Sequence, residues 1–313
     1  MREPTLSYVA LAARDTDAVH RFLSESLQLQ CSYRQLGDRS VAFYAVGRAA
    51  VAVFSVDDPY LEAPRFAGVH HMALAVSDPD ACAMRSGLPV THTGVGPDGQ
   101  AFVALAPAAT GGIRTRLVPA SDCPQAVGAV SRIDHLGIAS EDIDANVRIF
   151  VDALGCPLES SETDIELRHV TESFVSDKYG AVYRSRPTEI LGGLRGVFVT
   201  VGDCELEIMM DYDPQLQPLT DLGHAQGNTK GDQSAIANFI ARRGPGLVHV
   251  AFRTNDIDAM MAKLGAEGWR VIDQSGRPGG RASRIAFVHP SNFGGGVLLH
   301  FVEPHASEPR ASE

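Results

Sequence analysis

The chain has 313 residues, of which 44% are hydrophobic and 21% are charged, and it carries a formal net charge of −11. This composition is typical of a globular protein long enough for two domains of ordinary size, and the negative charge argues against a nucleic-acid partner or an anionic membrane. No apolar run approaches the roughly 20 residues of a membrane helix, no secretory signal pattern opens the chain, and five scattered cysteines without a CxxC pair indicate no disulfide framework, so we expect a cytoplasmic protein.

The first half of the chain predicts two units of the same kind, each a strand, a helix and later extended segments. These elements cover residues 7–12, 15–26 and 39–56 in the first unit and residues 68–76, 78–87 and 101–119 in the second. A stretch rich in small and polar residues follows from 119 to 131. We interpret it as a linker that ends a first domain over residues 1–122.

The second half repeats the pattern. The corresponding segments are 133–139, 141–155 and 204–210 in the third unit, and 247–254, 256–265 and 284–304 in the fourth. We predict a second domain over 131–304, with an insertion at 164–194 that contains one or two strands. The polar, glycine- and proline-rich stretch 211–233 is interpreted as a lid loop, because long loops in compact domains are usually functional or disordered. Residues 305–313 are expected to form a mobile tail.

The second and fourth units also share a late signature. FVALAPAATGGIRTRLVP in the second unit aligns with IAFVHPSNFGGGVLLHFVEP in the fourth, which sets Pro107 on Pro290 and Arg116 on His300. His249, in the middle of the strand LVHVAF, would taken alone more often be a hydrogen-bonded core residue than a ligand. Its recurrence at matching positions of other units favours a shared role.

Four such units, with a histidine early and a polar residue late, resemble the vicinal oxygen chelate superfamily of glyoxalases and type I extradiol dioxygenases. The resemblance implies an α+β fold of four βαβββ units that form two half-open curved mixed sheets, with a metal on a concave face. The second half is most similar to methylmalonyl-CoA epimerase. Residues 233–259, QSAIANFIARRGPGLVHVAFRTNDIDA, also resemble the metal-binding half of 4-hydroxyphenylpyruvate dioxygenase.

Position by position, the resemblance implies a ligand set drawn from four strands: His135, Glu207, His249 and His300. Three imidazoles and one carboxylate suit one divalent Fe, Mn, Co, Ni or Zn ion per chain. Gly137 and Ala139 share the predicted face of His135 and leave room over its ring. The alternatives are four unrelated buried side chains, or Glu205 in place of Glu207 if the strand register shifts by two.

The first half does not offer the same ligands. Its corresponding positions are Tyr8, Ala52, His71 and Arg116. Tyrosine, alanine and arginine do not hold a divalent cation beside a single histidine. We therefore predict a metal-free domain that has a structural or substrate-shaping role.

The reaction implied by the nearest resemblance is movement of a proton alpha to the carbonyl of a small hydroxyketone or an acyl thioester. Methylmalonyl-CoA epimerases use two glutamates for this reaction. In this chain one of the two matching positions is His300 and the other lies near Val199, so neither is a glutamate. A base must then come from elsewhere, and the candidates are Glu205 and, in the insertion, Tyr179 and His169. The substrate class is that of methylmalonyl-CoA epimerase or of cyclitol ketone 2-epimerases.

Two other functions stay open. A non-haem Fe(II) dioxygenase of the 4-hydroxyphenylpyruvate or extradiol type would use two histidines and one carboxylate, here His135, His249 and Glu207, although such enzymes take their carboxylate from the last strand. A small-molecule binding or resistance protein without catalysis typically lacks the ligand set. We expect a small-molecule substrate as partner and a possible homodimer. Residues 275–284, with three arginines, predict either a phosphate or coenzyme A contact or a plain hairpin.

Overall fold

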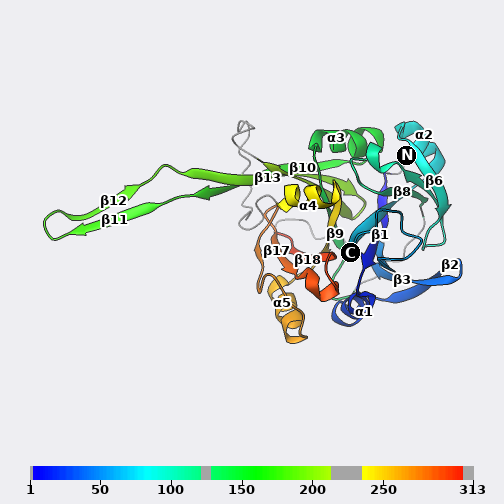
Figure 1. The fold of residues 1–313 in the computed structure, drawn as a ribbon, viewed down its shortest axis with the longest axis horizontal. Helices are drawn as coiled ribbons and strands as arrows, with labels where there is room; N and C mark the ends of the chain where they lie inside the picture. Colours follow the sequence, from blue (N-terminus) through cyan, green and yellow to red (C-terminus); the bar gives the residue numbers. More distant parts are fainter. Residues whose placement is uncertain (1–2, 121–127, 213–234, 306–313) are drawn as a thin grey trace.

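The computed structural model describes residues 3–120, 128–212 and 235–305, and they form two eight-stranded mixed sheets side by side (Figure 1). The first sheet has the order β2-β3-β4-β1-β5-β8-β7-β6. Its strands are β1 (Thr5–Ala13), β2 (Cys31–Leu36), β3 (Arg39–Val46), β4 (Ala49–Ser55), β5 (Gly68–Val76), β6 (Val90–Val95), β7 (Ala101–Leu105) and β8 (Thr115–Pro119).

The second sheet has the matching order β10-β13-β14-β9-β15-β18-β17-β16. Its strands are β9 (Ile133–Ala139), β10 (Leu158–Arg168), β13 (Glu189–Val201), β14 (Cys204–Tyr212), β15 (Gly246–Arg253), β16 (Arg277–Pro278), β17 (Arg284–Val288) and β18 (Leu298–Glu303). The fold class predicted from the sequence, α+β with two half-open curved mixed sheets, is confirmed.

Pairing at the centre of the second sheet follows directly from the repeat. The opening strands of its two units, β9 and β15, run antiparallel to each other. Each also pairs in parallel with a late strand of its own unit, β9 with β14 and β15 with β18. The four strands that carry the predicted ligands are therefore neighbours in the sheet.

An aspartate begins the main helix of every unit. The helices are α1 (Thr16–Arg21), α2 (Pro79–Ser86), α3 (Ile143–Val147) and α5 (Ile257–Ala266), and the first and third continue as π-helical turns η1 (Phe22–Ser26) and η3 (Arg148–Ala153). Asp15, Asp78, Asp142 and Asp256 each accept a hydrogen bond from the backbone N–H three residues later, at 2.9 Å. Such N-caps satisfy backbone donors that the helix itself cannot pair. The repeated aspartate thus fixes where each strand turns into its helix.

One continuous hydrophobic cluster joins the two halves of the chain. Trp269, the single tryptophan, is buried in it, with its ring 5.1 Å from that of Phe22 and perpendicular to it. The indole N–H donates to the Ser26 hydroxyl at 2.8 Å. Residues from the first and fourth units are therefore held together by both packing and a hydrogen bond.

Replacing Trp269 with alanine is expected to lower the free energy of unfolding by about 3–5 kcal/mol, because the side chain leaves a cavity between the halves. Chemical denaturation followed by circular dichroism measures the change. Tyr33→Ala removes an aromatic side chain that is 70% exposed and should stay within about 0.5 kcal/mol of the wild type. Equal effects of the two substitutions would contradict a stabilising role of this contact.

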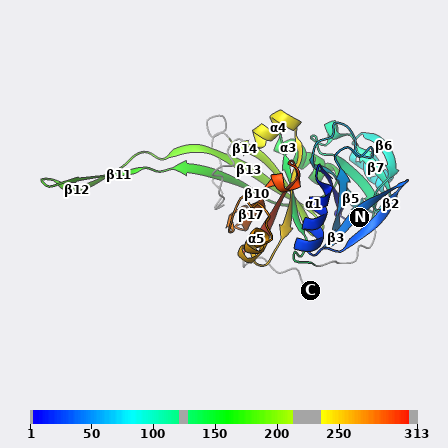
Figure 2. The ribbon, with the colours of Figure 1, turned by 60° about the horizontal axis from the view of Figure 1, so that its bottom comes forward.

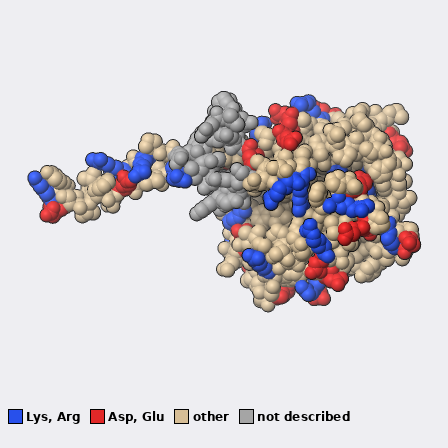
Figure 3. Space-filling view, viewed as in Figure 1, with Lys and Arg blue, Asp and Glu red and all other residues tan. Residues whose placement is uncertain are grey.

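The predicted insertion is a projecting arm. β10 and β13 continue beyond the sheet and lead to a separate two-stranded sheet, β11 (Thr171–Ser176) and β12 (Gly180–Ser185). Figure 1 and Figure 2 show the arm standing clear of the body in both views, and Figure 3 shows charged side chains along it. Every residue of β12 is exposed.

The remaining helical elements are α4 (Ala235–Arg243), which precedes β15, and the short 3-10 helices η2 (Pro107–Ala109) and η4 (Pro290–Phe293). Of the predicted lid loop, Asp211 and Tyr212 form the end of β14 and the rest lies outside the described residues, as does nearly all of the predicted tail. No described helix combines the length and apolarity needed to span a membrane.

Candidate metal centre

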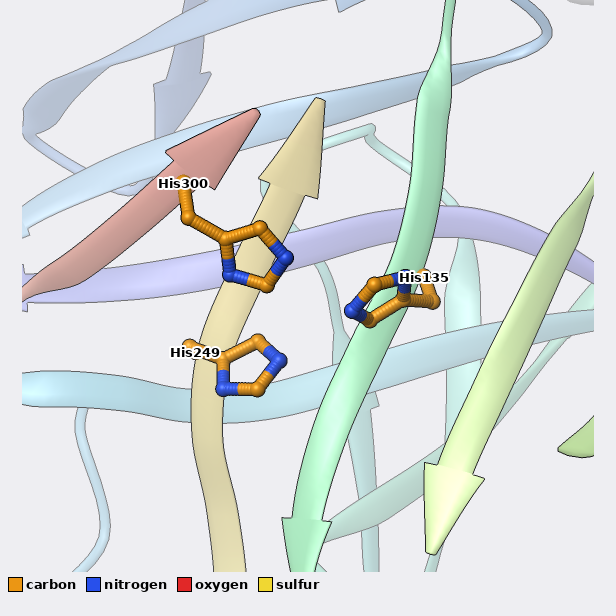
Figure 4. A group of neighbouring side chains, drawn as sticks. All are labelled: His135, His249 and His300. Atoms are coloured by element: carbon orange, nitrogen blue, oxygen red, sulfur yellow. The ribbon is translucent and has the colours of Figure 1, made fainter. Parts of the chain in front are cut away.

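Three histidine side chains from neighbouring strands point toward one another at the centre of the second sheet (Figure 4). They are His135 on β9, His249 on β15 and His300 on β18, and one ring nitrogen of each lies within 4.8 Å of the others. Their ring centroids are 4.5–5.3 Å apart. All three rings are buried. The strand order therefore converts three distant sequence positions into one cluster.

Glu207 completes the cluster from β14. Its Oε2 atom lies 3.3 Å from Nε2 of His135 and 3.3 Å from Nε2 of His249. The register of the sheet places Glu207 beside Gly137, two residues after His135. The structure thus brings together all four side chains that the sequence predicts as ligands.

The electrostatics of the cluster depend on burial and on Glu207. Burial alone would raise the pKa of Glu207, but His135 and His249 hold it well below its usual range. Burial opposes the charged form of His135, yet Glu207 and Asp134 outweigh it and raise its pKa to about 9. Burial lowers the pKa of His249 and His300. Two neutral imidazoles and an ionised carboxylate are what a divalent cation requires of its ligands.

The donor set fits a metal ion. Within the described residues, both ring nitrogens of His300 are buried without a hydrogen-bond partner, and Nε2 of His135 and Nε2 of His249 are buried facing Glu207 at 3.3 Å. Buried polar atoms of this kind are rare in folded proteins unless an ion or water completes them. Imidazole and carboxylate donors in this proportion suit Fe, Mn, Co, Ni or Zn, and a site for Mg or Ca would contain more oxygen.

Asp134 contacts the ring nitrogen of His135 that faces away from the cluster. This role was not predicted from the sequence. Its Oδ1 lies 3.0 Å from Nδ1 of His135, which leaves Nε2 of that ring to face the cluster. Burial would raise the pKa of Asp134, but His135 and the arginines around it hold the pKa well below its usual range. The guanidinium of Arg281 donates to the same carboxylate at 2.6 Å. A carboxylate directly before a ligand histidine, as in Ile133-Asp134-His135, is the sequence signal that would have identified it.

We expect Asp134→Asn to weaken metal binding about 10–100-fold, because the amide cannot fix the ring of His135 as the carboxylate does. Competition with a fluorescent chelator measures the affinity. The thermal unfolding of the metal-free variant must be recorded as well, since the substitution also removes a buried charge that pairs with Arg281. Unchanged affinity in a folded variant would contradict the orienting role.

Gly137 provides the space for His249. A Cβ atom at this position would lie 2.1 Å from Cε1 and 2.3 Å from Nε2 of the His249 ring. The sequence predicts that Gly137 leaves room over His135 on its own strand. In the structure, the space left by Gly137 is filled by the ring of His249 from the adjacent strand β15.

The cluster forms the floor of a cavity of about 170 Å³. Most of its wall is apolar and comes from both units of the second half: Leu194, Phe198, Met209, Ile236, Val248, Ile285, Phe287 and Leu298. Two further carboxyl groups, Glu162 and Asp164 of β10, also line it. The site is therefore a small apolar chamber with its charged groups at defined points.

The candidate bases predicted from the sequence lie elsewhere. Tyr179 lies in the turn between β11 and β12 and is 73% exposed, and His169 is exposed between β10 and β11. Glu205 precedes the cluster on β14, and burial raises its pKa to about 7. None of the three is among the described residues that line the cavity. Glu207, rather than Glu205, approaches the histidines.

The corresponding positions of the first half hold a different arrangement. Arg116 is buried there, donates to Glu62 at 2.8 Å, and lies with its guanidinium carbon 4.2 Å from the centroid of the Phe102 ring. The Tyr8 hydroxyl is 3.4 Å from Nε2 of His71. A side-chain cation thus occupies the place that matches His300.

The three arginines of residues 275–284 all pair with carboxylates of the chain. Arg277 lies 3.3 Å from Asp273, Arg281 binds Asp134, and Arg284 binds Asp258 at 2.7 Å. This pairing favours the hairpin interpretation over a phosphate contact. Arg281 instead binds Asp134, the carboxylate that contacts His135.

Comparisons with known proteins place the second half in one group. Residues 134–287 match the family model described as Glyoxalase/Bleomycin resistance protein/Dioxygenase superfamily. Over 184 residues, 59% of this chain, the sequence is 24% identical to the whole of the uncharacterized protein YqjC from Bacillus subtilis (strain 168). Over 175 residues, 56% of this chain, it is 19% identical to 79% of mitochondrial methylmalonyl-CoA epimerase from Dictyostelium discoideum.

A solved structure extends the likeness in shape to both halves. The chain superimposes over 96% of its length on 93% of a mutant of 4-hydroxymandelate synthase from Streptomyces coelicolor, with a TM-score of 0.59 and 16% sequence identity. At this identity the likeness concerns the fold alone.

Proposed function

We propose that this chain, which through residues 134–287 belongs to the Glyoxalase/Bleomycin resistance protein/Dioxygenase superfamily, is a metal-dependent epimerase or isomerase that moves a proton alpha to a carbonyl group. The proposal rests on two features that lie in the same cavity. A cluster suited to a divalent cation lies in the same apolar cavity as carboxyl groups that are not part of the cluster.

A bound divalent ion would polarise a carbonyl oxygen and so acidify the adjacent C–H bond. The chain's own residues supply the remaining conditions. His135, His249, His300 and Glu207 would hold the ion. The wall of the chamber is mostly apolar, which strengthens electrostatic interactions inside it. Proton transfer then requires a carboxyl group within reach of the substrate.

The size of the chamber limits the reacting part of the substrate. Its volume of about 170 Å³ is below the ~300–1,000 Å³ of sites for drug-sized ligands. A small hydroxyketone fits this limit, and so does the acyl end of a thioester whose carrier stays outside. The relative from Dictyostelium discoideum is a methylmalonyl-CoA epimerase, which supports the thioester as one of the two substrates to test.

The test is proton exchange in D₂O with the metal-loaded protein. Methylmalonyl-CoA and 2-hydroxycyclohexanone serve as probes, and NMR reports deuterium alpha to the carbonyl. We expect exchange that is lost after treatment with a chelator and restored by one equivalent of metal. Metal bound at one equivalent without exchange of either probe would contradict the proposal.

A second candidate function rests on the two contacts of Glu207. Because Oε2 of Glu207 lies 3.3 Å from both His135 and His249, these residues contain the two-histidine, one-carboxylate set of non-haem Fe(II) oxygenases. His300 would be a fourth ligand and would leave less room for O₂. Iron-dependent oxygen uptake with a candidate substrate, measured with an oxygen electrode, would favour this function over proton transfer.

A further inference from the structure

Glu162 is a half-buried carboxyl group of β10 that lines the cavity. It lies opposite Gly196 in the register of β10 and β13. Glu162 lies over this part of β13, with its Cγ 3.6 Å from where a Cβ atom of Gly196 would stand. The side chain therefore crosses its neighbouring strand and reaches the chamber that His135 and Glu207 also line.

The loop between β16 and β17 fixes the carboxylate in place. The backbone N–H of Arg281 donates to Oε2 of Glu162 at 2.8 Å. Oε1 lies 2.2 Å from the point where a Cβ atom of Gly280 would be, so this position tolerates no side chain without movement. Arg281 and Ala282 have φ values of 55° and 54°, a conformation that costs energy for residues other than glycine. Strain of this kind persists where surrounding contacts maintain it.

Arg281 also links Glu162 to the ligand cluster. While its backbone N–H binds Glu162, its guanidinium donates to Asp134, whose carboxylate contacts His135. One strained residue thus sets the positions of a carboxyl group outside the cluster and of a ligand histidine relative to each other. A proton-transfer group needs this kind of fixed position relative to the group that polarises its substrate.

We propose that Glu162 is the base that removes the proton alpha to the substrate carbonyl, an inference that rests on the proposed function. The C–H bond breaks and an O–H bond forms on Glu162. The electron pair of the C–H bond becomes the C=C bond of an enolate, and the π pair of the carbonyl group moves to its oxygen. Return of a proton from Glu162 restores the starting compound. Return of a proton from solvent at the opposite face inverts the carbon centre, and Glu162 then releases its own proton to solvent.

The protonation behaviour of Glu162 suits this role. Burial raises its pKa to about 7, and the charges of Asp164 on its own strand and Glu207 on β14 add to the effect, while Arg281 opposes it. A base with a pKa near the working pH exchanges protons readily. Since the ionised form accepts the proton, the exchange rate should rise as the pH increases through about 7.

The test compares Glu162→Gln with a matched control. Glu159→Gln changes an exposed glutamate on the same strand. Exchange of methylmalonyl-CoA and 2-hydroxycyclohexanone in D₂O should fall about 10²–10⁴-fold in Glu162→Gln and stay at the wild-type rate in Glu159→Gln. Glu162→Asp should keep part of the activity. Metal content, measured by elemental analysis, should be equal in all four proteins.

A second readout does not depend on turnover. With carbon-13-labelled glutamate, the carboxyl resonances of Glu162 and Glu205 should both titrate near pH 7. In Glu162→Gln the first should be absent and the second should remain. An active wild type whose exchange is unaffected by Glu162→Gln would overturn the role of Glu162 and leave the proposed function standing. A metal-loaded wild type that exchanges neither probe would overturn both.

Discussion

Replacing His249 with alanine is expected to abolish metal binding at the cluster. The ring lies between its partners, 3.3 Å from Glu207 and with its centroid 4.5 Å from that of His300. Loss of a supporting residue around a metal typically costs about 10–100-fold in affinity, and loss of a ligand should exceed this. Elemental analysis after dialysis against metal-free buffer should show less than about one tenth of the wild-type content, and proton exchange should be lost.

The control for this experiment is His92→Ala. His92 is an exposed histidine on β6 of the first sheet, so its loss should leave the metal content unchanged. His300→Ala guards against a variant-specific folding defect, because it removes a different member of the same cluster. If both cluster variants stay folded by circular dichroism and retain a full equivalent of metal, the ion is bound elsewhere.

Gly137→Ala should have an effect of similar size although it removes no ligand. A Cβ atom would stand 2.1–2.5 Å from three atoms of the His249 imidazole, closer than any real contact. The ring must leave the cluster or the strands must separate, and overpacking of this kind costs about 1–3 kcal/mol. We expect loss of most of the bound metal, measured by elemental analysis, together with a lower midpoint of thermal unfolding.

Gly196→Ala provides the comparison, because it is the same substitution on another strand of the same sheet. The nearest atom to its new methyl group would be Cγ of Glu162 at 3.6 Å, an ordinary van der Waals distance. This variant should bind metal as the wild type does. Equal metal contents of the Gly137 and Gly196 variants would show that the ring of His249 can move without loss of the site.

The sequence was sufficient to predict the fold and the residues that meet at the cluster, because both follow from one repeated pattern. Each unit has a strand whose alternation predicts one buried face, and the N-capping aspartates recur at the same place. Once β9 and β15 pair at the centre of a sheet, His135 and His249 must be neighbours. The matching positions of the histidines in the repeats therefore indicated a shared site, which no single histidine indicates by itself.

The candidate bases could not be predicted in the same way. Whether Tyr179 approaches the cavity depends on the direction in which the hairpin of β11 and β12 projects, and no local pattern encodes that direction. Glu162 depends on Gly280 and Arg281, which are more than 100 residues away in the chain and lie in a loop outside the repeat. Such contacts become visible when the strands and loops are placed in space.

Because of Arg116, the two halves of the molecule differ in where the cation of their buried site comes from. Each sheet has a buried site on matching strands, but the first carries its own cation, bonded covalently to the chain and neutralised by Glu62. The second sheet, under the proposed assignment, binds its cation from solution. Its stability therefore depends on the free concentration of that ion. Depletion of the ion would then lower the stability of the second sheet, whereas the buried site of the first sheet needs no ion from solution.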